Sequence, residues 1–242
     1  SWFVLSSFVA TLILYVIMLL ASTWGMLIFL GIRFYRSMYT DEGYLSHTLP
    51  VTANQLFLSK VLVSGVWYLF ITIGIGISVV ALIVSLMTGL LNIGELSGVL
   101  TQYNGNIWEF LADAFYELGR TYEEEMGINL LHYGITLLLT YVAGPFIAMV
   151  TLFGALTIGQ LSSKHKGFMG ILVYAGVTIL SSIIGSTVQS AFMFGANVAN
   201  SASGITVSTN SAYDINVITS LLLAAIMYGV SYYIMNRKLN LD

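Results

Sequence analysis

Cysteine is absent from the 242 residues, which excludes a disulfide framework, a thiolate nucleophile and a zinc–thiolate site. Charge is scarce as well, because only 8% of the residues are charged, against about a quarter in ordinary soluble domains. A net charge of -3 excludes the basic surface that nucleic acid binding requires. Apolar residues make up 57% of the chain, so the composition indicates a protein that lies in lipid.

The common catalytic motifs are also missing from the sequence. There is no G-x-x-x-x-G-K-[ST] phosphate loop, so the chain is not expected to hydrolyse ATP itself. Neither H-E-x-x-H nor G-x-S-x-G occurs, and we expect no catalytic residue, no bound cofactor and no metal ligand in this chain. Glu123–Glu125 can be read as a cation site, but three consecutive carboxylates on a helix point in different directions and more often form a solvated end.

Five apolar runs are long enough to cross a membrane as helices, which takes about 20 residues. They predict an all-α, polytopic integral membrane protein folded as a single transmembrane domain over residues 1–242. The predicted spans are residues 2–32, 61–87, 128–161, 168–188 and 215–235. Small residues in the first two spans, Gly25, Gly31, Gly65 and Gly74, are expected to allow close packing against neighbouring helices.

The distribution of lysine and arginine predicts the orientation of these spans, because basic residues concentrate on the cytoplasmic side. Loops 33–60 and 160–166 and the carboxyl end are therefore expected inside, and loops 88–127 and 189–214 outside. Only Arg120 lies on the predicted outer side. Seven basic residues lie on the inner side: Arg33, Arg36, Lys60, Lys164, Lys166, Arg237 and Lys238.

The outer loop 88–127 contains an amphipathic pattern. Apolar side chains at helical spacing form one stripe: Trp108, Leu111, Phe115, Leu118 and Tyr122. Acidic residues occupy the opposite face, so this helix either lies on the outer leaflet or packs against the rest of the protein.

Two features distinguish the third span. Gly144 and Pro145 predict a kink or a break, because proline removes a backbone donor and clashes with the preceding turn. His132 lies near the outer end, where it is either a proton relay or an ordinary hydrogen-bonded histidine; its interfacial depth favours the second reading.

The polar stretch between the first two spans carries the most specific pattern. Thr40 or Asp41 can cap a short helix over residues 42–47, with Glu42 in its first turn. Pro50 prevents that helix from continuing, and Thr52 can cap the next one. From these residues alone, a solvated loop and a docking element remain equally acceptable.

The run DEGYLSHTLPVTANQLFLSK, residues 41–60, resembles the first cytoplasmic loop of permeases of the ATP-binding-cassette type-2 exporter family, in its Gram-positive bacterial form. The resemblance is detailed over these twenty residues and general, in hydropathy and loop order, over the rest. In such permeases this loop holds a coupling helix that docks on a separate ATPase. The resemblance implies this role for Asp41, Glu42, Gly43, Tyr44, Leu45, Leu49 and Pro50.

The resemblance further implies an exporter in the bacterial plasma membrane that moves an amphipathic or apolar substrate. Its expected partners are a cytoplasmic ATPase subunit, which would bind the ATP and Mg, and a second permease. The family usually has six spans, so one span before residue 1 is expected to be missing from this sequence. Segment 189–198 is either a re-entrant helix, as in the family, or a flexible loop.

Two other functions fit the same sequence. One is a membrane scaffold or sensor that binds another protein through its acidic outer helix. The other is an ion-coupled secondary transporter, against which the uncharged spans 61–87 and 168–188 argue, since coupled ions usually require intramembrane carboxylates or broken helices.

Overall fold

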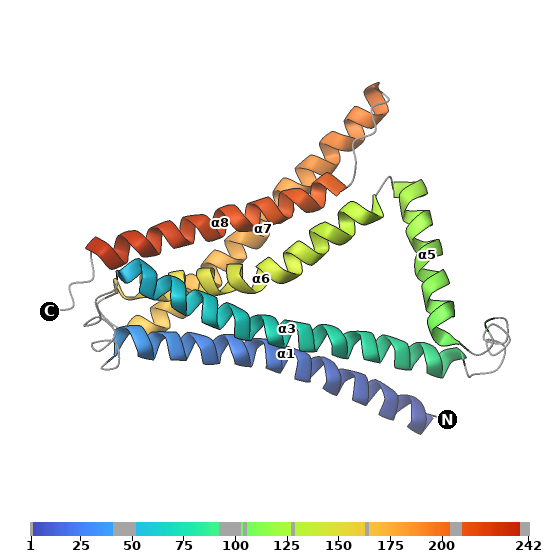
Figure 1. The fold of residues 1–242 in the computed structure, drawn as a ribbon, viewed down its shortest axis with the longest axis horizontal. Helices are drawn as coiled ribbons and strands as arrows, with labels where there is room; N and C mark the ends of the chain where they lie inside the picture. Colours follow the sequence, from blue (N-terminus) through green and yellow to red (C-terminus); the bar gives the residue numbers. More distant parts are fainter. Residues whose placement is uncertain are drawn as a thin grey trace. The chain divides into compact units, whose positions relative to one another are not determined.

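All the regular secondary structure in the part of the chain that the computed structural model describes is α-helical (Figure 1). The described residues are 2–40, 52–91, 103, 106–126, 129–162, 165–203 and 210–237. They form α1 (Trp2–Tyr39), α3 (Ala53–Leu91), α5 (Ile107–Met126), α6 (Leu130–Gly159), α7 (Lys166–Ser203) and α8 (Asn210–Arg237). All but α5 are long and apolar enough to cross a membrane, which confirms the predicted all-α class with five spanning helices.

Four of the five spanning helices extend beyond the predicted spans, whereas α6 (Leu130–Gly159) lies within the predicted span 128–161. α3 has 39 residues, which corresponds to about 58 Å, roughly twice the thickness of a hydrocarbon core. Hydropathy marks only the part of a helix that lies in lipid, whereas backbone hydrogen bonding continues into the polar region.

α7 shows the largest difference between expectation and structure. It continues without interruption to Ser203, so residues 189–203 belong to the same helix as the fourth span. They form neither a separate re-entrant helix nor a loop. Alanine, phenylalanine and methionine in residues 189–198 are compatible with a helix, and the one residue type that would end it, proline, is absent there.

The start of α3 confirms the predicted cap. The Gln55 N–H donates to Thr52 Oγ1 at 3.3 Å, and the Thr52 N–H donates to Gln55 Oε1 at 3.1 Å. This reciprocal pair is a capping box, which satisfies backbone donors that the first helical turn leaves unpaired. It fixes the point at which the chain enters α3.

The chain divides into two compact units, where the sequence predicts one domain. Unit 1 comprises residues 1–73, 141–183 and 220–242, and unit 2 comprises residues 74–140 and 184–219. Long helices pass from one unit to the other, so helix length alone did not indicate this division.

Charge separates with the two units. The described charged residues of unit 1 are all basic: Arg33, Arg36, Lys60, Lys166 and Arg237. Unit 2 carries the described acidic residues and Arg120, which lies 3.7 Å from Glu117 and 3.5 Å from Glu124 on the exposed face of α5. Seven acidic residues are described there: Glu109, Asp113, Glu117, Glu123, Glu124, Glu125 and Asp214.

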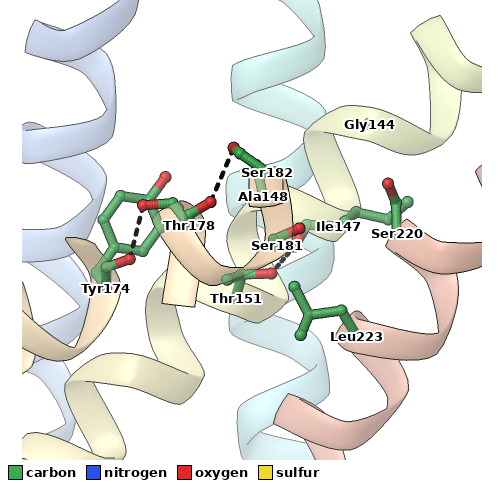
Figure 2. A pocket seen from close by; sticks show the side chains of 10 residues that line it. All are labelled: Gly144, Ile147, Ala148, Thr151, Tyr174, Thr178, Ser181, Ser182, Ser220 and Leu223. Atoms are coloured by element: carbon green, nitrogen blue, oxygen red, sulfur yellow. Dashed lines mark hydrogen bonds between the residues drawn. The ribbon is translucent and has the colours of Figure 1, made fainter. Parts of the chain in front are cut away.

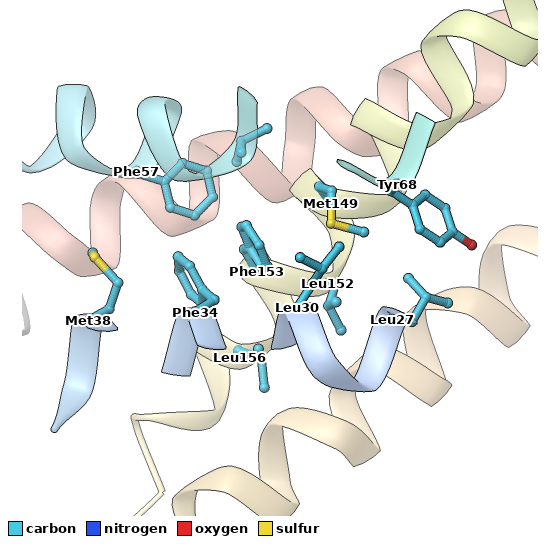
Figure 3. Close-up of a cluster of buried hydrophobic side chains, with 11 residues drawn as sticks. Leu27, Leu30, Phe34, Met38, Phe57, Tyr68, Met149, Leu152, Phe153 and Leu156 are labelled. Atoms are coloured by element: carbon cyan, nitrogen blue, oxygen red, sulfur yellow. The ribbon is translucent and has the colours of Figure 1, made fainter. Parts of the chain in front are cut away.

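Unit 1 contains the hydrophobic core, which α1, α3 and α6 supply (Figure 3). Phe34 stacks on Phe153 with ring centroids 4.0 Å apart, and Phe57 meets Phe34 edge-on at 6.0 Å. The core consists of Leu27, Leu30, Phe34, Met38, Phe57, Val61, Tyr68, Met149, Leu152, Phe153 and Leu156.

The predicted packing role of small residues is confirmed at two of four glycines. A Cβ at Gly31 would lie 3.6 Å from Leu152, and one at Gly65 would overlap the ring of Phe146, so both glycines face α6 closely. At Gly25 and Gly74 a Cβ would meet no described atom within 4 Å, so the packing role of these two glycines stays a prediction. A glycine in an apolar run does not by itself indicate which side of the helix has a neighbour.

Pro145 lies inside α6 without interrupting it. The helix is continuous over Leu130–Gly159, and Pro145 is buried in unit 1. The predicted break at Gly144 and Pro145 therefore does not occur, and the kink stays a prediction.

Unit 2 confirms the amphipathic helix as α5. Its junction with α6 is compact, because Leu130 packs against Gly119 and the Leu130 N–H donates to Glu123 Oε1 at 3.2 Å. The apolar stripe of α5, unlike its junction with α6, is not covered by the described part of the chain, because Trp108, Phe115 and Leu118 are all exposed there. The lipid contact of this stripe stays a prediction.

Candidate functional site

The coupling residues predicted from the sequence, Asp41 to Leu49 with Pro50, lie outside the described residues. The structure describes the helices from which this segment leaves and to which it returns. α1 is helical to Tyr39, and α3 begins at Ala53. The contacts of these two helix ends determine to which other helices a displacement of segment 41–51 would be transmitted.

The end of α1 is fastened to α6. The Tyr39 hydroxyl lies 2.8 Å from Thr157 Oγ1. Thr157 is fully buried, and its own hydroxyl donates to the Phe153 carbonyl oxygen at 2.8 Å. Because a threonine hydroxyl has a single proton, Tyr39 is the donor in the bond to Thr157.

The start of α3 is fastened to α8. The Tyr228 hydroxyl donates to Asn54 Oδ1, and the Tyr228 ring packs against Phe57 with centroids 5.9 Å apart. Phe57 is also the side chain that meets Phe34 of α1. The described helix ends on both sides of segment 41–51 therefore contact the same group of rings.

These contacts form one connected group, which we call the anchor cluster. It joins α1, α3, α6 and α8 within unit 1 through stacking, edge-on ring contacts and two buried or half-buried hydrogen bonds. Packed cores deform little, so a push on segment 41–51 would move these helix ends together. The anchor cluster consists of Phe34, Tyr39, Asn54, Phe57, Phe153, Thr157 and Tyr228.

The anchor cluster was not predicted from the sequence. Its residues lie in four separate helices, and each is an ordinary aromatic or small polar residue of an apolar run. The signal that could have found it is the presence of Tyr39 and Asn54 directly beside the polar stretch, since such polar tips need partners when they are buried.

Unit 1 also contains a hydroxyl-lined pocket of about 240 Å³ between α6, α7 and α8 (Figure 2). No charged residue lines it. Its walls are Gly144, Ile147, Ala148, Thr151, Tyr174, Thr178, Ser181, Ser182, Ser220 and Leu223.

The hydroxyls of this pocket are compatible with an apolar medium. Thr151 donates to the Ile147 carbonyl oxygen at 2.8 Å, and Ser182 donates to that of Thr178 at 2.9 Å. Each group keeps oxygen lone pairs that can accept a further bond. The pocket therefore offers polar contacts without charge. The pocket was not predicted from the sequence, although Tyr174, Thr178 and Ser181 follow one another at helical spacing.

His132 has a carboxylate partner in unit 2. Its Nε2 lies 2.9 Å from Asp214 Oδ2, and Thr136 donates to Asp214 Oδ1 at 3.1 Å. The His132 backbone N–H donates to Asn129 Oδ1 at 3.0 Å, which caps α6. This arrangement links α6 to the start of α8, and it fits the hydrogen-bonded histidine that interfacial depth favours.

The described residues contain no group of three or more histidine, aspartate or glutamate side chains that could hold a metal ion. Within α5 the consecutive residues Glu123 and Glu124 are both exposed, as in the solvated reading of that run.

Comparisons of this chain with protein-family models, with curated proteins and with solved structures found no match.

Proposed function

We propose that this chain is the membrane-spanning permease subunit of an ATP-binding-cassette exporter of the type-2 class. A separate cytoplasmic ATPase would bind the ATP and Mg and would drive transport through segment 41–49. Two permeases would form the pathway in the bacterial plasma membrane, with the carboxyl terminus of each in the cytoplasm.

The observation that carries the proposal is the anchor cluster. A docking segment transmits force only if its ends are fixed to the helices that must move. Tyr39 and Asn54, which flank segment 41–51 closely, bond to α6 and α8 respectively. A solvated loop has no need for such fastening at both ends.

The charge separation supports the proposed orientation. Every described charged residue of unit 1 is basic, and unit 1 includes the helix ends on either side of segment 41–51. Basic residues concentrate on the cytoplasmic side of membrane proteins, where an ATPase would be available.

The hydroxyl-lined pocket supports an uncharged or amphipathic cargo. Thr151, Thr178 and Ser182 supply hydrogen-bonding groups, whereas Ile147 and Leu223 supply apolar surface. A strongly charged cargo would find no compensating charge among the lining residues, and burying an unpaired charge is costly.

The test is a pair of substitutions in the docking segment, Glu42→Lys and Leu45→Asp. We expect each to leave membrane insertion intact, to weaken co-purification of the ATPase and to abolish ATP-dependent transport, because charge and apolar anchoring would both be lost. The matched control is Glu109→Lys on exposed α5, which should change neither.

Because the chain has no cysteine, a single Leu45→Cys variant gives an unambiguous topology probe. Labelling of this residue by a membrane-impermeant maleimide only after the cells are opened supports the proposal. Labelling in intact cells, or unchanged transport in both docking variants, would refute it.

A protein-binding scaffold is the second candidate, and the exposed stripe of α5 favours it. Trp108, Phe115 and Leu118 offer an apolar surface that unit 2 does not cover in its described part. A scaffold would retain its function in an ATPase-deficient strain, whereas an exporter subunit would lose it.

A further inference from the structure

Two adjoining pockets lie between α1 and α3 in unit 1, and they share Leu30, Arg33 and Trp67. Their volumes are about 200 and 450 Å³. We call them together the α1–α3 groove. It is lined by Met26, Phe29, Leu30, Arg33, Phe34, Ser37, Ser59, Lys60, Val63, Ser64, Trp67, Phe70 and Ile71.

The smaller pocket is polar and positively charged. Arg33 of α1 and Lys60 of α3 both line it, and neither forms an ion pair with a described residue. No acidic side chain is among the lining residues. Ser64, half-buried beside them, forms no hydrogen bond in the described part of the chain, so its hydroxyl is available as a donor.

The larger pocket is apolar apart from Arg33 at its border with the smaller one. Met26, Phe29, Phe70 and Ile71 line it, and Trp67 stands where the two pockets meet. The Phe70 and Trp67 side chains are 63% and 56% exposed, so a long apolar surface is open beside the two cations.

The groove changes from polar to apolar along the helix axis. On α3 the order is Lys60, Ser64, Trp67 and Ile71, and on α1 the polar residues Ser37 and Arg33 precede Leu30 and Met26 in the same direction. Eleven residues separate Lys60 from Ile71, which corresponds to about 16 Å. One leaflet of a hydrocarbon core is about 15 Å thick.

We infer that the α1–α3 groove binds one anionic phospholipid, with its phosphate between Arg33 and Lys60 and an acyl chain along Trp67 and Phe70. Charge complementarity selects the headgroup, because two cations that have no acidic partner among the described residues favour the phosphate of a lipid with net negative charge. The length and position of the apolar half select a lipid over a soluble anion. This inference needs only that α1 and α3 span a membrane, and it does not depend on the proposed exporter function.

Another protein segment is a less suitable occupant. An apolar helix laid on this groove would bury Arg33 and Lys60 without counter-charges, and uncompensated buried charges are costly. A phospholipid leaves both side chains at the membrane surface, where long basic side chains place their charged ends.

Trp67 provides a direct test in the full-length chain. Replacing Trp2, Trp24 and Trp108 by phenylalanine leaves Trp67 as the single tryptophan. The protein is reconstituted into vesicles of phosphatidylcholine that contain either brominated phosphatidylglycerol or brominated phosphatidylcholine over the same series of mole fractions, and the quenching of Trp67 fluorescence is measured. We expect brominated phosphatidylglycerol to reach half-maximal quenching at a mole fraction about 25-fold lower than brominated phosphatidylcholine, because each of the two basic residues near an anionic lipid adds about fivefold in affinity.

The variant Arg33→Gln/Lys60→Gln should reduce this preference to about one, as the loss of two such contributions requires. The matched control is Arg36→Gln/Lys166→Gln, which removes the same charge without touching a groove-lining residue and should keep the preference. Circular dichroism and the elution volume in size-exclusion chromatography show whether each variant is folded. A further variant, Ser64→Val, keeps both charges and should lower the preference only partly.

Three outcomes would overturn the inference. The first is equal quenching by the two brominated lipids in the parent chain, and the second is an equal loss of preference in the control variant. The third is loss of the quenching when inorganic phosphate is added, which would indicate a site for a soluble anion. Photocrosslinking gives an independent test. A benzophenone side chain introduced at Phe70 should crosslink to lipid, and crosslinking to protein instead would also refute the inference.

Discussion

Phe153→Ala removes the ring at the centre of the anchor cluster. Phe153 is 0% exposed, and its ring lies flat on that of Phe34 with an angle of 4° between the ring planes. Phe34 in turn contacts Phe57, so the substitution takes away the side chain through which α6 reaches both helices next to segment 41–51.

The expected cost follows from this geometry. A buried Phe→Ala change in a water-soluble core costs about 3–5 kcal/mol, as the sum of a transfer contribution and a cavity contribution. Between helices that are already in lipid the transfer contribution is small, and packing dominates. We therefore expect a loss of about 2 kcal/mol, mainly the cavity part, which is about 30-fold in the folding equilibrium.

The measurement is equilibrium unfolding of the purified chain in mixed micelles by increasing fractions of a denaturing detergent, followed by circular dichroism. The control is Phe168→Ala, because Phe168 belongs to α7 of the same unit and is 62% exposed. It should unfold close to the parent.

A double variant with Phe34→Ala isolates the stacked pair. The loss in the double variant should be smaller than the sum of the single losses by about 0.5–1.5 kcal/mol, the typical contribution of an aromatic pair. If Phe153→Ala is no more destabilising than Phe168→Ala, or if the two ring losses add, the anchor cluster does not hold the helices as described.

Two further predictions concern helix contacts. Gly159→Ala should destabilise the chain by about 1–3 kcal/mol in the same unfolding assay, because a Cβ there would lie 2.6 Å from the Gly170 Cα. The control Gly25→Ala, where a Cβ would meet no described atom within 4 Å, should be neutral or slightly stabilising. Equal effects of the two substitutions would show that α6 and α7 do not meet at Gly159. Asp214→Asn should cost about 0.2–1 kcal/mol in the same assay, because it weakens the contacts of Asp214 with His132 Nε2 at 2.9 Å and with Thr136 at 3.1 Å between partly exposed side chains. An unchanged free energy of unfolding would contradict this pairing.

Several elements could be predicted from local rules. Apolar runs of more than 20 residues must form helices, because lipid offers no partners for backbone N–H and C=O groups. The pattern of Trp108, Phe115 and Tyr122 predicted α5, and Thr52 followed by Gln55 is a capping box that needs only four residues to form. These features depend on residues that are close together in the sequence, so the sequence was sufficient to predict them.

Only part of the candidate site could be predicted from the sequence. Segment 41–49 was identified by its charge pattern and by a resemblance, and its docking role stays a prediction. The bonds that fasten the adjoining helix ends, Tyr39 to Thr157 and Tyr228 to Asn54, join residues 118 and 174 positions apart. No local spacing relates such distant positions.

The sequence by itself determined that this chain is an all-helical membrane protein with five spanning helices and one amphipathic helix. Only the tertiary structure decided which side of each helix meets another helix, and hence that Phe34 faces Phe153, that α7 continues to Ser203 and that Arg33 and Lys60 share a groove. The physical reason is that a spanning helix is apolar on all sides, because both lipid and neighbouring helices accept apolar side chains. In water the hydrophobic face of a helix points to the core, but in lipid that signal disappears, and close packing alone selects the contacts.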